Sequence, residues 1–187
     1  SGPWSEPSSW RSRPRRVVAI ADRGYRDLMQ ATELPIPGLL MLEPIRRVDD
    51  RGSFVELFNV VTLAEAGIRD EFIQENLAHS SAPGTVRGLH FQVPPEPQAK
   101  LVRVARGAIL DVAVDLRVGS PTYGDHVAVP LDAESGRQLF VPAGFAHGYC
   151  TAEPDTQVAY WVAGRWRAVR TKRLFFFSLE RERDLGG

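Results

Sequence analysis

Seven polar side chains spread along the middle and the C-terminal half of the chain form a set that could move protons. They are Arg51, Arg87, His90, Lys100, Asp111, His147 and Tyr160. A neutral histidine accepts a proton near pH 7, and a tyrosine can return one. A lysine or an arginine stabilises negative charge that develops on an oxygen atom. The set therefore suits abstraction of a proton next to a carbonyl group.

The stretch from Val86 to Tyr149 must position most of this set. It contains VRGLHFQ, AKLVRVARGAILDVAVDLR and GRQLFVPAGFAHGY, in that order. Short segments rich in valine and leucine, broken by glycine and proline, predict antiparallel strands of a barrel or a sandwich. In such a barrel we expect His90 and His147 to point inward.

Within that stretch, LDVAVDL alternates strictly between two faces of a predicted strand. Asp111, Ala113 and Asp115 share one face. The other face carries Leu110, Val112, Val114 and Leu116. Asp111 has an alternative role as the partner of Lys100, which would keep that amine charged.

The rest of the chain repeats the same strand-and-turn texture. Residues 35–59 predict a strand, a turn at 49–52 and a second strand, and Arg106-Gly107 predicts a turn between two further strands. Residues 61–68 predict a short helix with Thr62 as its N-cap and Glu65 completing a capping box. Residues 71–86 predict a strand followed by a loop, and the proline-rich VPPEPQ predicts a loop or an edge. The predicted class is all-β, a barrel or sandwich with one or two short helices.

Composition narrows the class of protein further. The 187 residues carry 23 basic and 23 acidic side chains, so no global field attracts nucleic acid or an anionic membrane. A single cysteine, Cys150, excludes an intrachain disulfide framework and suits a reducing cytoplasm. No apolar run is long enough to cross a bilayer. We therefore expect a soluble cytoplasmic protein. A weaker alternative is a nucleic-acid contact through the basic residues 1–28.

A spacing of glycine, proline and histidine near residue 147 resembles the second sequence motif of the cupin superfamily. Gly136, Pro142, Gly144 and His147 follow the pattern G-x5-P-x-G-x2-H. The first cupin motif usually supplies two more histidines and a glutamate as metal ligands. Here the sequence runs His-Phe-Gln from His90, and Gln98 or Lys100 stands where the carboxylate would be. Such residues are poor ligands for zinc or iron, so we expect no metal.

Several longer segments resemble the dTDP-4-dehydrorhamnose 3,5-epimerase family. They are DDRGSFVELFN, FIQEN, TVRGLHFQVPPEPQAKLVRVARGAILDVAVDLR, SPTYG and GRQLFVPAGFAHGY, together with Tyr160. The resemblance covers roughly residues 35–161. It implies a cupin-type jelly roll, a homodimer, and no metal or organic cofactor. The implied activity is epimerisation of a dTDP-linked 4-keto-6-deoxyhexose at C3 and C5, in dTDP-rhamnose biosynthesis.

The same resemblance implies catalytic roles for four residues. His90 matches the base that removes the C3 and C5 protons, and Tyr160 matches the acid on the opposite face of the sugar. Lys100 matches the lysine that stabilises the enolate at the C4 oxygen. The family pairs its base with an aspartate near the C-terminus, and Asp184 is the nearest candidate here. By default, Tyr160 would be a strand aromatic and Lys100 a solvent-facing amine.

The resemblance also implies substrate-binding positions. His147 and Arg87 match residues that line the sugar and phosphate pocket. Positions that hold the nucleotide diphosphate, some of them across the dimer interface, correspond to Arg51, Phe54, Glu56, Gln74 and Asn76. Trp166 takes the place of the second tyrosine in a Tyr-Tyr pair that follows the catalytic tyrosine.

The sequence departs from the family after Tyr160, where it reads YWVAGRWRAVRTKRLFFF. We expect a basic extension over residues 1–28, a cupin jelly roll over 29–166 and a divergent tail over 167–187. The departure leaves open a single-centre 3- or 5-epimerase, a 3,4-ketoisomerase, or a non-catalytic cupin that binds nucleotide sugars.

Overall fold

The computed structural model describes residues 17–20, 29–164 and 171–173. Strands dominate these residues, which confirms the predicted all-β class. The elements, in chain order, are β1 (Val17–Ile20), β2 (Met29–Glu33), β3 (Leu40–Pro44), β4 (Arg47–Asp49), β5 (Gly52–Phe54), α1 (Val60–Glu65), β6 (Phe72–Ser80), β7 (Val86–Gln92), β8 (Lys100–Arg106), β9 (Ala108–Asp115), β10 (His126–Asp132), β11 (Gln138–Val141), β12 (Phe145–Thr151), β13 (Thr156–Ala163) and β14 (Thr171–Arg173).

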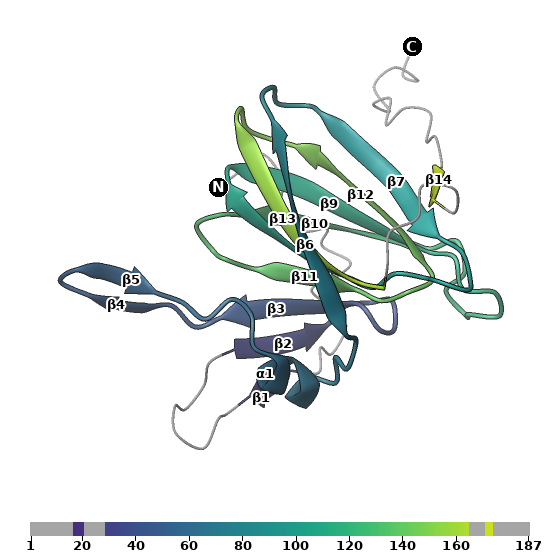
Figure 1. Cartoon of the computed structure of the whole chain (residues 1–187), viewed down its shortest axis with the longest axis horizontal. Coiled ribbons are helices and arrows are strands. Elements are labelled where there is room, and N and C mark those ends of the chain that lie inside the picture. Colours follow the sequence, from purple (N-terminus) through teal and green to yellow (C-terminus); the bar gives the residue numbers. More distant parts are fainter. Residues whose placement is uncertain (1–16, 21–28, 165–170, 174–187) are drawn as a thin grey trace, which may run out of the picture.

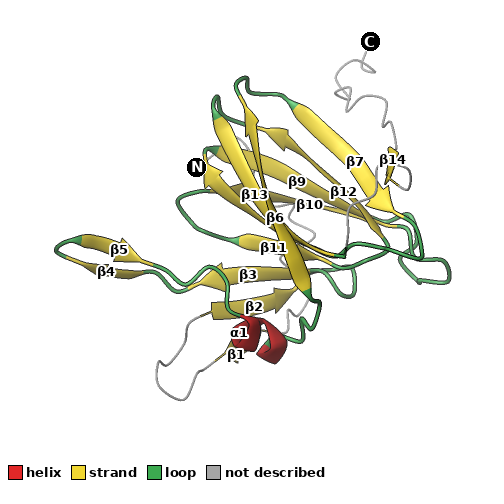
Figure 2. Ribbon diagram, viewed as in Figure 1, coloured by secondary structure: helices red, strands yellow, loops and turns green. Residues whose placement is uncertain are grey.

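Two antiparallel sheets form the body of the fold (Figure 1 and Figure 2). The seven-stranded sheet has the order β1-β2-β3-β11-β8-β13-β6, and the five-stranded sheet has the order β10-β9-β12-β7-β14. Apolar side chains from both sheets make one core, with Val102 and Leu139 from the first and Ile109, Val129 and Phe145 from the second. The two sheets therefore face each other as the jelly roll that the sequence predicted.

A second core lies on the other side of the seven-stranded sheet, where α1 packs. Leu63 and Ile68 bury themselves there against Leu101. Full burial of one such side chain contributes roughly 2 kcal/mol. Phe58 adds a ring stacked on Trp161 at a centroid distance of 5.0 Å. This packing covers the outer face of β8 and β13, so their inward-facing residues remain free to line the barrel.

The start of α1 differs from the sequence prediction. Asn59, not Thr62, is the N-cap: its backbone is extended, and its Oδ1 accepts from the amides of Val61 and Thr62 at 2.9 and 3.4 Å. The Thr62 side chain is buried and its hydroxyl donates to Glu56. Glu65 is the last helical residue, so no capping box forms. The helix begins at Val60, so Thr62 lies inside its first turn, and the amide side chain of Asn59 serves as the cap.

The turns came out as predicted. Residues 49–52 connect β4 to β5 in a two-stranded ribbon, and Gly107 connects β8 to β9. The proline-rich stretch forms the loop between β7 and β8. In the described part of the chain, no helix is long and apolar enough to span a membrane.

Short pieces of both predicted terminal segments join the sheets. β1 pairs with β2 along its whole length, and β14 pairs with β7, with Arg173 opposite His90. The remainder of residues 1–28 and of 167–187 lies outside the described residues. The predicted domain boundaries therefore stay a prediction.

Candidate active site

The inward face of β9 carries two buried carboxylates. Asp111, Ala113 and Asp115 are all 0% exposed, whereas Leu110 and Val112 are half-buried on the opposite face. The predicted alternation is therefore correct, and the polar face is the one turned toward the barrel. Burial of an ionised carboxylate destabilises the fold by roughly several kcal/mol unless hydrogen bonds or an opposite charge compensate for the lost hydration. Both carboxylates must therefore have partners.

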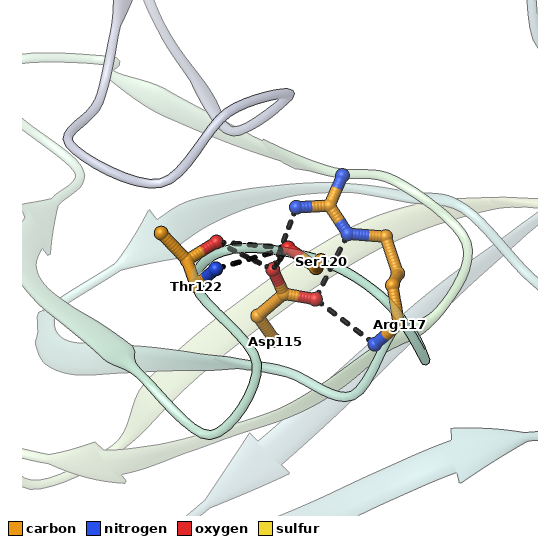
Figure 3. A network of polar contacts seen from close by, with 4 residues as sticks. All are labelled: Asp115, Arg117, Ser120 and Thr122. Carbon is orange, nitrogen blue, oxygen red and sulfur yellow. Dashed lines mark hydrogen bonds and ion pairs between the residues drawn. The ribbon is translucent and has the colours of Figure 1, made fainter.

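Asp115 finds its partners in the loop that follows β9 (Figure 3). Arg117 donates from Nε at 2.8 Å and from Nη2 at 2.7 Å. The hydroxyls of Ser120 and Thr122 donate at 2.6 and 2.7 Å. The guanidinium of Arg117 holds the pKa of the Asp115 carboxyl far below its usual range, and these hydroxyls add to the effect. The network ties the loop to the end of the strand and leaves no part of the carboxylate for chemistry.

Asp111 pairs with His147 instead. Its Oδ1 lies 2.8 Å from Nε2 of His147, whose side chain is also buried. An ionised carboxylate only accepts hydrogen bonds, so Nε2 carries the hydrogen. No hydrogen bond joins Asp111 to Lys100, although the negative charge of Asp111 still acts on that amine, as the predicted pairing required. The pair is possible because β12 lies beside β9, with Tyr149 opposite Asp111 and His147 opposite Ala113.

Two glycines bring His90 next to His147. On β7 and β12 these histidines are directly opposite each other, and directly opposite residues of an antiparallel pair share a face. A Cβ atom on Gly88 would lie 2.5 Å from the Cα of Gly148, and one on Gly148 would lie 2.7 Å from the carbonyl oxygen of Arg87. Only glycine allows this approach. The Arg-Gly-Leu-His and Ala-His-Gly segments thus place both histidines on the inward face.

Lys100 reaches into the same space from the other sheet. It is the first residue of β8, and its Nζ donates to the carbonyl oxygen of His90 at 3.4 Å. Burial lowers the pKa of the Lys100 ammonium to about 8, and the negative charge of Asp111 opposes that shift. At neutral pH the amine therefore still carries a positive charge, now close to His90 inside the barrel.

Tyr160 also faces the interior from the seven-stranded sheet. It lies opposite Val102 of β8 and Asn76 of β6, and it packs against the core between the sheets. Burial raises the pKa of its phenol, while the positive charge of Arg87 opposes the shift. The phenol therefore remains protonated at neutral pH and can donate a proton. His90 and Tyr160 thus face one compartment from opposite sheets.

Three of the predicted binding residues lie on strands near Tyr160. Asn76 is directly opposite it, and Gln74 donates to Asn76 at 2.6 Å along the edge strand β6. Arg87 does not extend freely into solvent: its guanidinium donates to the hydroxyl of Ser80 at 3.1 Å and to the carbonyl oxygen of His79 at 2.8 Å. Its positive charge acts on the phenol of Tyr160, so the guanidinium lies near that side chain.

The other predicted binding residues lie elsewhere in this chain. Arg51 and Phe54 belong to the β4–β5 ribbon, which projects away from the barrel (Figure 1). Arg51 is exposed and pairs with Asp49, and Phe54 is 71% exposed. Glu56 accepts from Asn59 and from Thr62 beside α1. One chain alone therefore does not bring these three residues to His90. Trp166 and Asp184 lie outside the described residues.

Sequence reasoning did not single out Tyr149. Tyr149 lies on β12 two residues beyond His147, and it is 7% exposed in the core between the sheets. Its alternation with His147 was a usable signal for an inward position. As for metals, no three histidine, cysteine, aspartate or glutamate side chains converge within residues 29–164. The expectation of a site without metal stays a prediction.

A jelly roll with an imidazole, an ammonium and a phenol turned toward one interior is a cupin-type barrel equipped for acid–base chemistry. The family model described as dTDP-4-dehydrorhamnose 3,5-epimerase matches residues 33–177. A dTDP-4-dehydrorhamnose 3,5-epimerase of Sinorhizobium fredii is 45% identical over 152 residues, which cover 79% of this chain and 76% of that protein. The chain therefore belongs to the dTDP-4-dehydrorhamnose 3,5-epimerase family.

Solved structures agree with this assignment. The Bacillus anthracis dTDP-4-dehydrorhamnose 3,5-epimerase, with TDP and PPi bound, matches with a TM-score of 0.78 and 42% identity, over 81% of this chain and 87% of that one. The Legionella pneumophila dTDP-6-deoxy-D-glucose-3,5-epimerase, in complex with dTDP-4-keto-L-rhamnose, matches with a TM-score of 0.75 and 38% identity. That match covers 79% of this chain and 78% of the other.

Proposed function

We propose that this chain is an isomerase that epimerises a dTDP-linked 4-keto-6-deoxyhexose at C3 and C5, in the synthesis of dTDP-rhamnose. The observation that carries the proposal is the placement of His90 and Tyr160 on opposite sheets of one interior, with the Lys100 amine between the sheets beside His90. Membership of the epimerase family and the sugar nucleotide bound to the Legionella protein support the same substrate class.

The chemistry follows from the positions of these groups. His90 removes the proton from C3. The electrons of the broken C3–H bond form a double bond between C3 and C4, and the π electrons of the ketone move onto its oxygen. The Lys100 ammonium stabilises the resulting enolate oxygen. Tyr160 then donates its proton to C3 from the opposite face, and the ketone re-forms. His90 releases its proton to water and Tyr160 regains one from water, so the same steps can occur at C5.

The buried Asp111–His147 pair contributes to this arrangement in two ways. The hydrogen bond to Asp111 fixes the orientation of the His147 ring beside the strand that carries His90. The negative charge of Asp111 also raises the pKa of Lys100 toward its ordinary value. We therefore assign His147 to the pocket wall and Asp111 to keeping the amine charged.

Proton exchange tests the proposal. With dTDP-4-keto-6-deoxyglucose in deuterated water, the wild-type protein should introduce deuterium at C3 and at C5, and His90→Ala should abolish both. His79→Ala is the matched control, because His79 is an exposed histidine paired with Asp155 on the outside of the fold. Label at one carbon alone would indicate a single-centre epimerase. No label, with a melting temperature raised by dTDP, would indicate a binding protein without this activity.

We further propose a homodimer in which the β4–β5 ribbon serves the partner's site. The ribbon projects from its own barrel, and a hollow of about 430 Å³ is lined by Arg47, Val48, Asp49, Arg51, Gly52, Ser53 and Phe54. Ile73 and Leu77 are exposed on one face of the edge strand β6. Both features suit contact with a second copy. Gln74, Asn76, Glu56, Trp166 and Asp184 keep the roles that the family resemblance implies.

Mixed dimers test this arrangement. Arg51→Ala and His90→Ala should each be inactive alone. If the ribbon of one protomer completes the site of the other, a mixture of the two variants contains dimers with one intact site, and activity returns toward a quarter of the wild-type value, about the fraction that random pairing produces. A monomer in sedimentation, or no recovery on mixing, would contradict the proposal.

The free thiol of Cys150 suits the proposed cytoplasmic location.

A further inference from the structure

Tyr149 is a buried residue with a polar group that the chemistry above does not use. Its side chain is 7% exposed, and among the described residues its hydroxyl has no hydrogen-bond partner. A buried hydroxyl without a partner costs free energy, so folded proteins rarely retain one without a reason. A phenylalanine would fill the same space without that cost.

The surroundings of the hydroxyl are those of the reaction site. Tyr149 lies directly opposite Asp111 on β9 and Arg87 on β7. Its phenol also interacts electrostatically with Tyr160 across the interior. The second oxygen of Asp111, Oδ2, is buried and likewise has no partner within the described residues. A hydroxyl donor and a carboxylate acceptor therefore remain unsatisfied on neighbouring strands of one wall.

A polar group of a bound sugar can form hydrogen bonds with these two groups, whereas an apolar group cannot. The phenol of Tyr149 donates, since burial raises its pKa to about 12, with opposition from Arg87, and keeps the proton in place. Of the nucleotide-binding positions that the family resemblance implies, Arg51 and Phe54 lie on the β4–β5 ribbon, which projects away from this wall (Figure 1). Tyr149 interacts with Tyr160, the proposed acid for the sugar ring, so the group that meets the Tyr149 hydroxyl belongs to the hexose.

We infer that Tyr149 is a further substrate-binding residue, whose hydroxyl donates a hydrogen bond to an oxygen of the bound hexose and holds the ring between His90 and Tyr160. The inference rests on the proposed function for the identity of the ligand. It assigns to Tyr149 a role in orienting the ring that neither the sequence motifs nor the proton-transfer steps require.

Tyr149→Phe removes only the oxygen atom and tests the inference directly. We expect the affinity for dTDP-L-rhamnose, which lacks the reactive ketone, to fall about tenfold, as for the loss of one hydrogen bond to a ligand. The affinity for dTDP should stay unchanged. The melting temperature should stay the same or rise by up to about 3 °C, because an unsatisfied buried hydroxyl has been removed. Tyr123→Phe, at an exposed tyrosine outside the barrel, is the matched control and should change none of these values.

Two results would overturn the inference. One is wild-type affinity for dTDP-L-rhamnose in Tyr149→Phe, which would mean that the hydroxyl binds water alone. The other is a lower melting temperature together with an equal loss of affinity for dTDP and for dTDP-L-rhamnose, which would mean a structural role. The exchange experiment on the wild-type protein is a separate readout. Its failure would remove the proposed reaction, while the two binding constants would still decide the role of Tyr149.

Discussion

Asp111 and Asp115 lie on the same face of β9, and both are completely buried, yet they differ in how far their oxygens are satisfied. Both oxygens of Asp115 accept hydrogen bonds, from Arg117, Ser120 and Thr122. The Oδ1 atom of Asp111 is hydrogen-bonded to His147, and its Oδ2 atom has no partner within the described residues. A fully satisfied buried network builds structure, whereas an incomplete one marks a place where something binds.

The difference follows from where each residue lies on the strand. Asp115 is the last residue of β9, so the following loop can fold back over it and supply donors close in sequence. Asp111 lies in the middle of the strand, where only neighbouring strands can supply partners. Residues at strand ends are thus easily enclosed by their own loop, and residues inside the barrel remain available to a ligand.

The largest effect that we expect is a loss of stability when Asp115 is replaced. Asp115→Ala leaves Arg117 without its carboxylate and removes the anchor of the loop, so the free energy of unfolding should fall by about 3 kcal/mol. Urea denaturation measures this free energy of unfolding. Asp125→Ala, at an exposed aspartate of the same loop, should change the free energy by less than about 0.5 kcal/mol. Equal effects of the two variants would refute a structural role for the network.

Acid should weaken the fold through the same residue. The pKa of Asp115 is lowered in the folded protein, mainly by Arg117, so its contribution to stability is present above the unfolded pKa and is lost as the pH falls toward the folded pKa. The wild-type protein should therefore lose stability progressively below about pH 4. Asp115→Ala should show a shallower decline over the same range in unfolding experiments. Parallel curves would show that other carboxylates cause the acid sensitivity.

At Asp111 the expected loss is in activity. In the wild-type protein the negative charge of Asp111 holds His147 and raises the pKa of Lys100. Asp111→Asn removes that charge, so kcat should fall about 30-fold, or roughly 2 kcal/mol of transition-state stabilisation. Lys100 loses its proton above about pH 8, so the wild-type rate should decline there. In the variant that decline should begin at lower pH.

The exposed pair of His79 and Asp155 provides the control for Asp111. Its two side chains are about half exposed and lie 3.3 Å apart. Asp155→Asn should leave kcat and its pH profile unchanged, since an exposed pair contributes roughly 0–1 kcal/mol. If Asp111→Asn kept the wild-type pH profile, Asp111 would have no influence on Lys100 during catalysis.

The smallest expected effect concerns one donor of the Asp115 network. Thr122→Val removes the hydroxyl that donates to Asp115 at 2.7 Å, and the free energy of unfolding should fall by about 1.5 kcal/mol. Thr122→Ser keeps the hydroxyl and should recover most of that loss. Neither variant should change the rate of proton exchange. An effect on the rate would mean that this loop contributes to the site.

Local pattern was enough to predict most of the elements and several positions in the site. Alternating apolar residues predicted the strands, and Gly107 and the 49–52 turn were recognisable from residue type. The inward position of His147 also followed from motif spacing. Alternation put Asp111 on one face of its strand, and only the structure showed that this face is the inner one. These features depend on residues a few positions apart, whose geometry the backbone itself imposes.

Only the tertiary structure decided the partners. Asp111 pairs with His147, 36 residues later, because β9 and β12 are neighbours in the sheet. Asn59 caps α1 because the helix begins at Val60, which places Thr62 inside the helix. Burial left the Tyr149 hydroxyl without a partner among the described residues. Spacing in the sequence specifies which face a side chain occupies, but long-range packing specifies what it meets there.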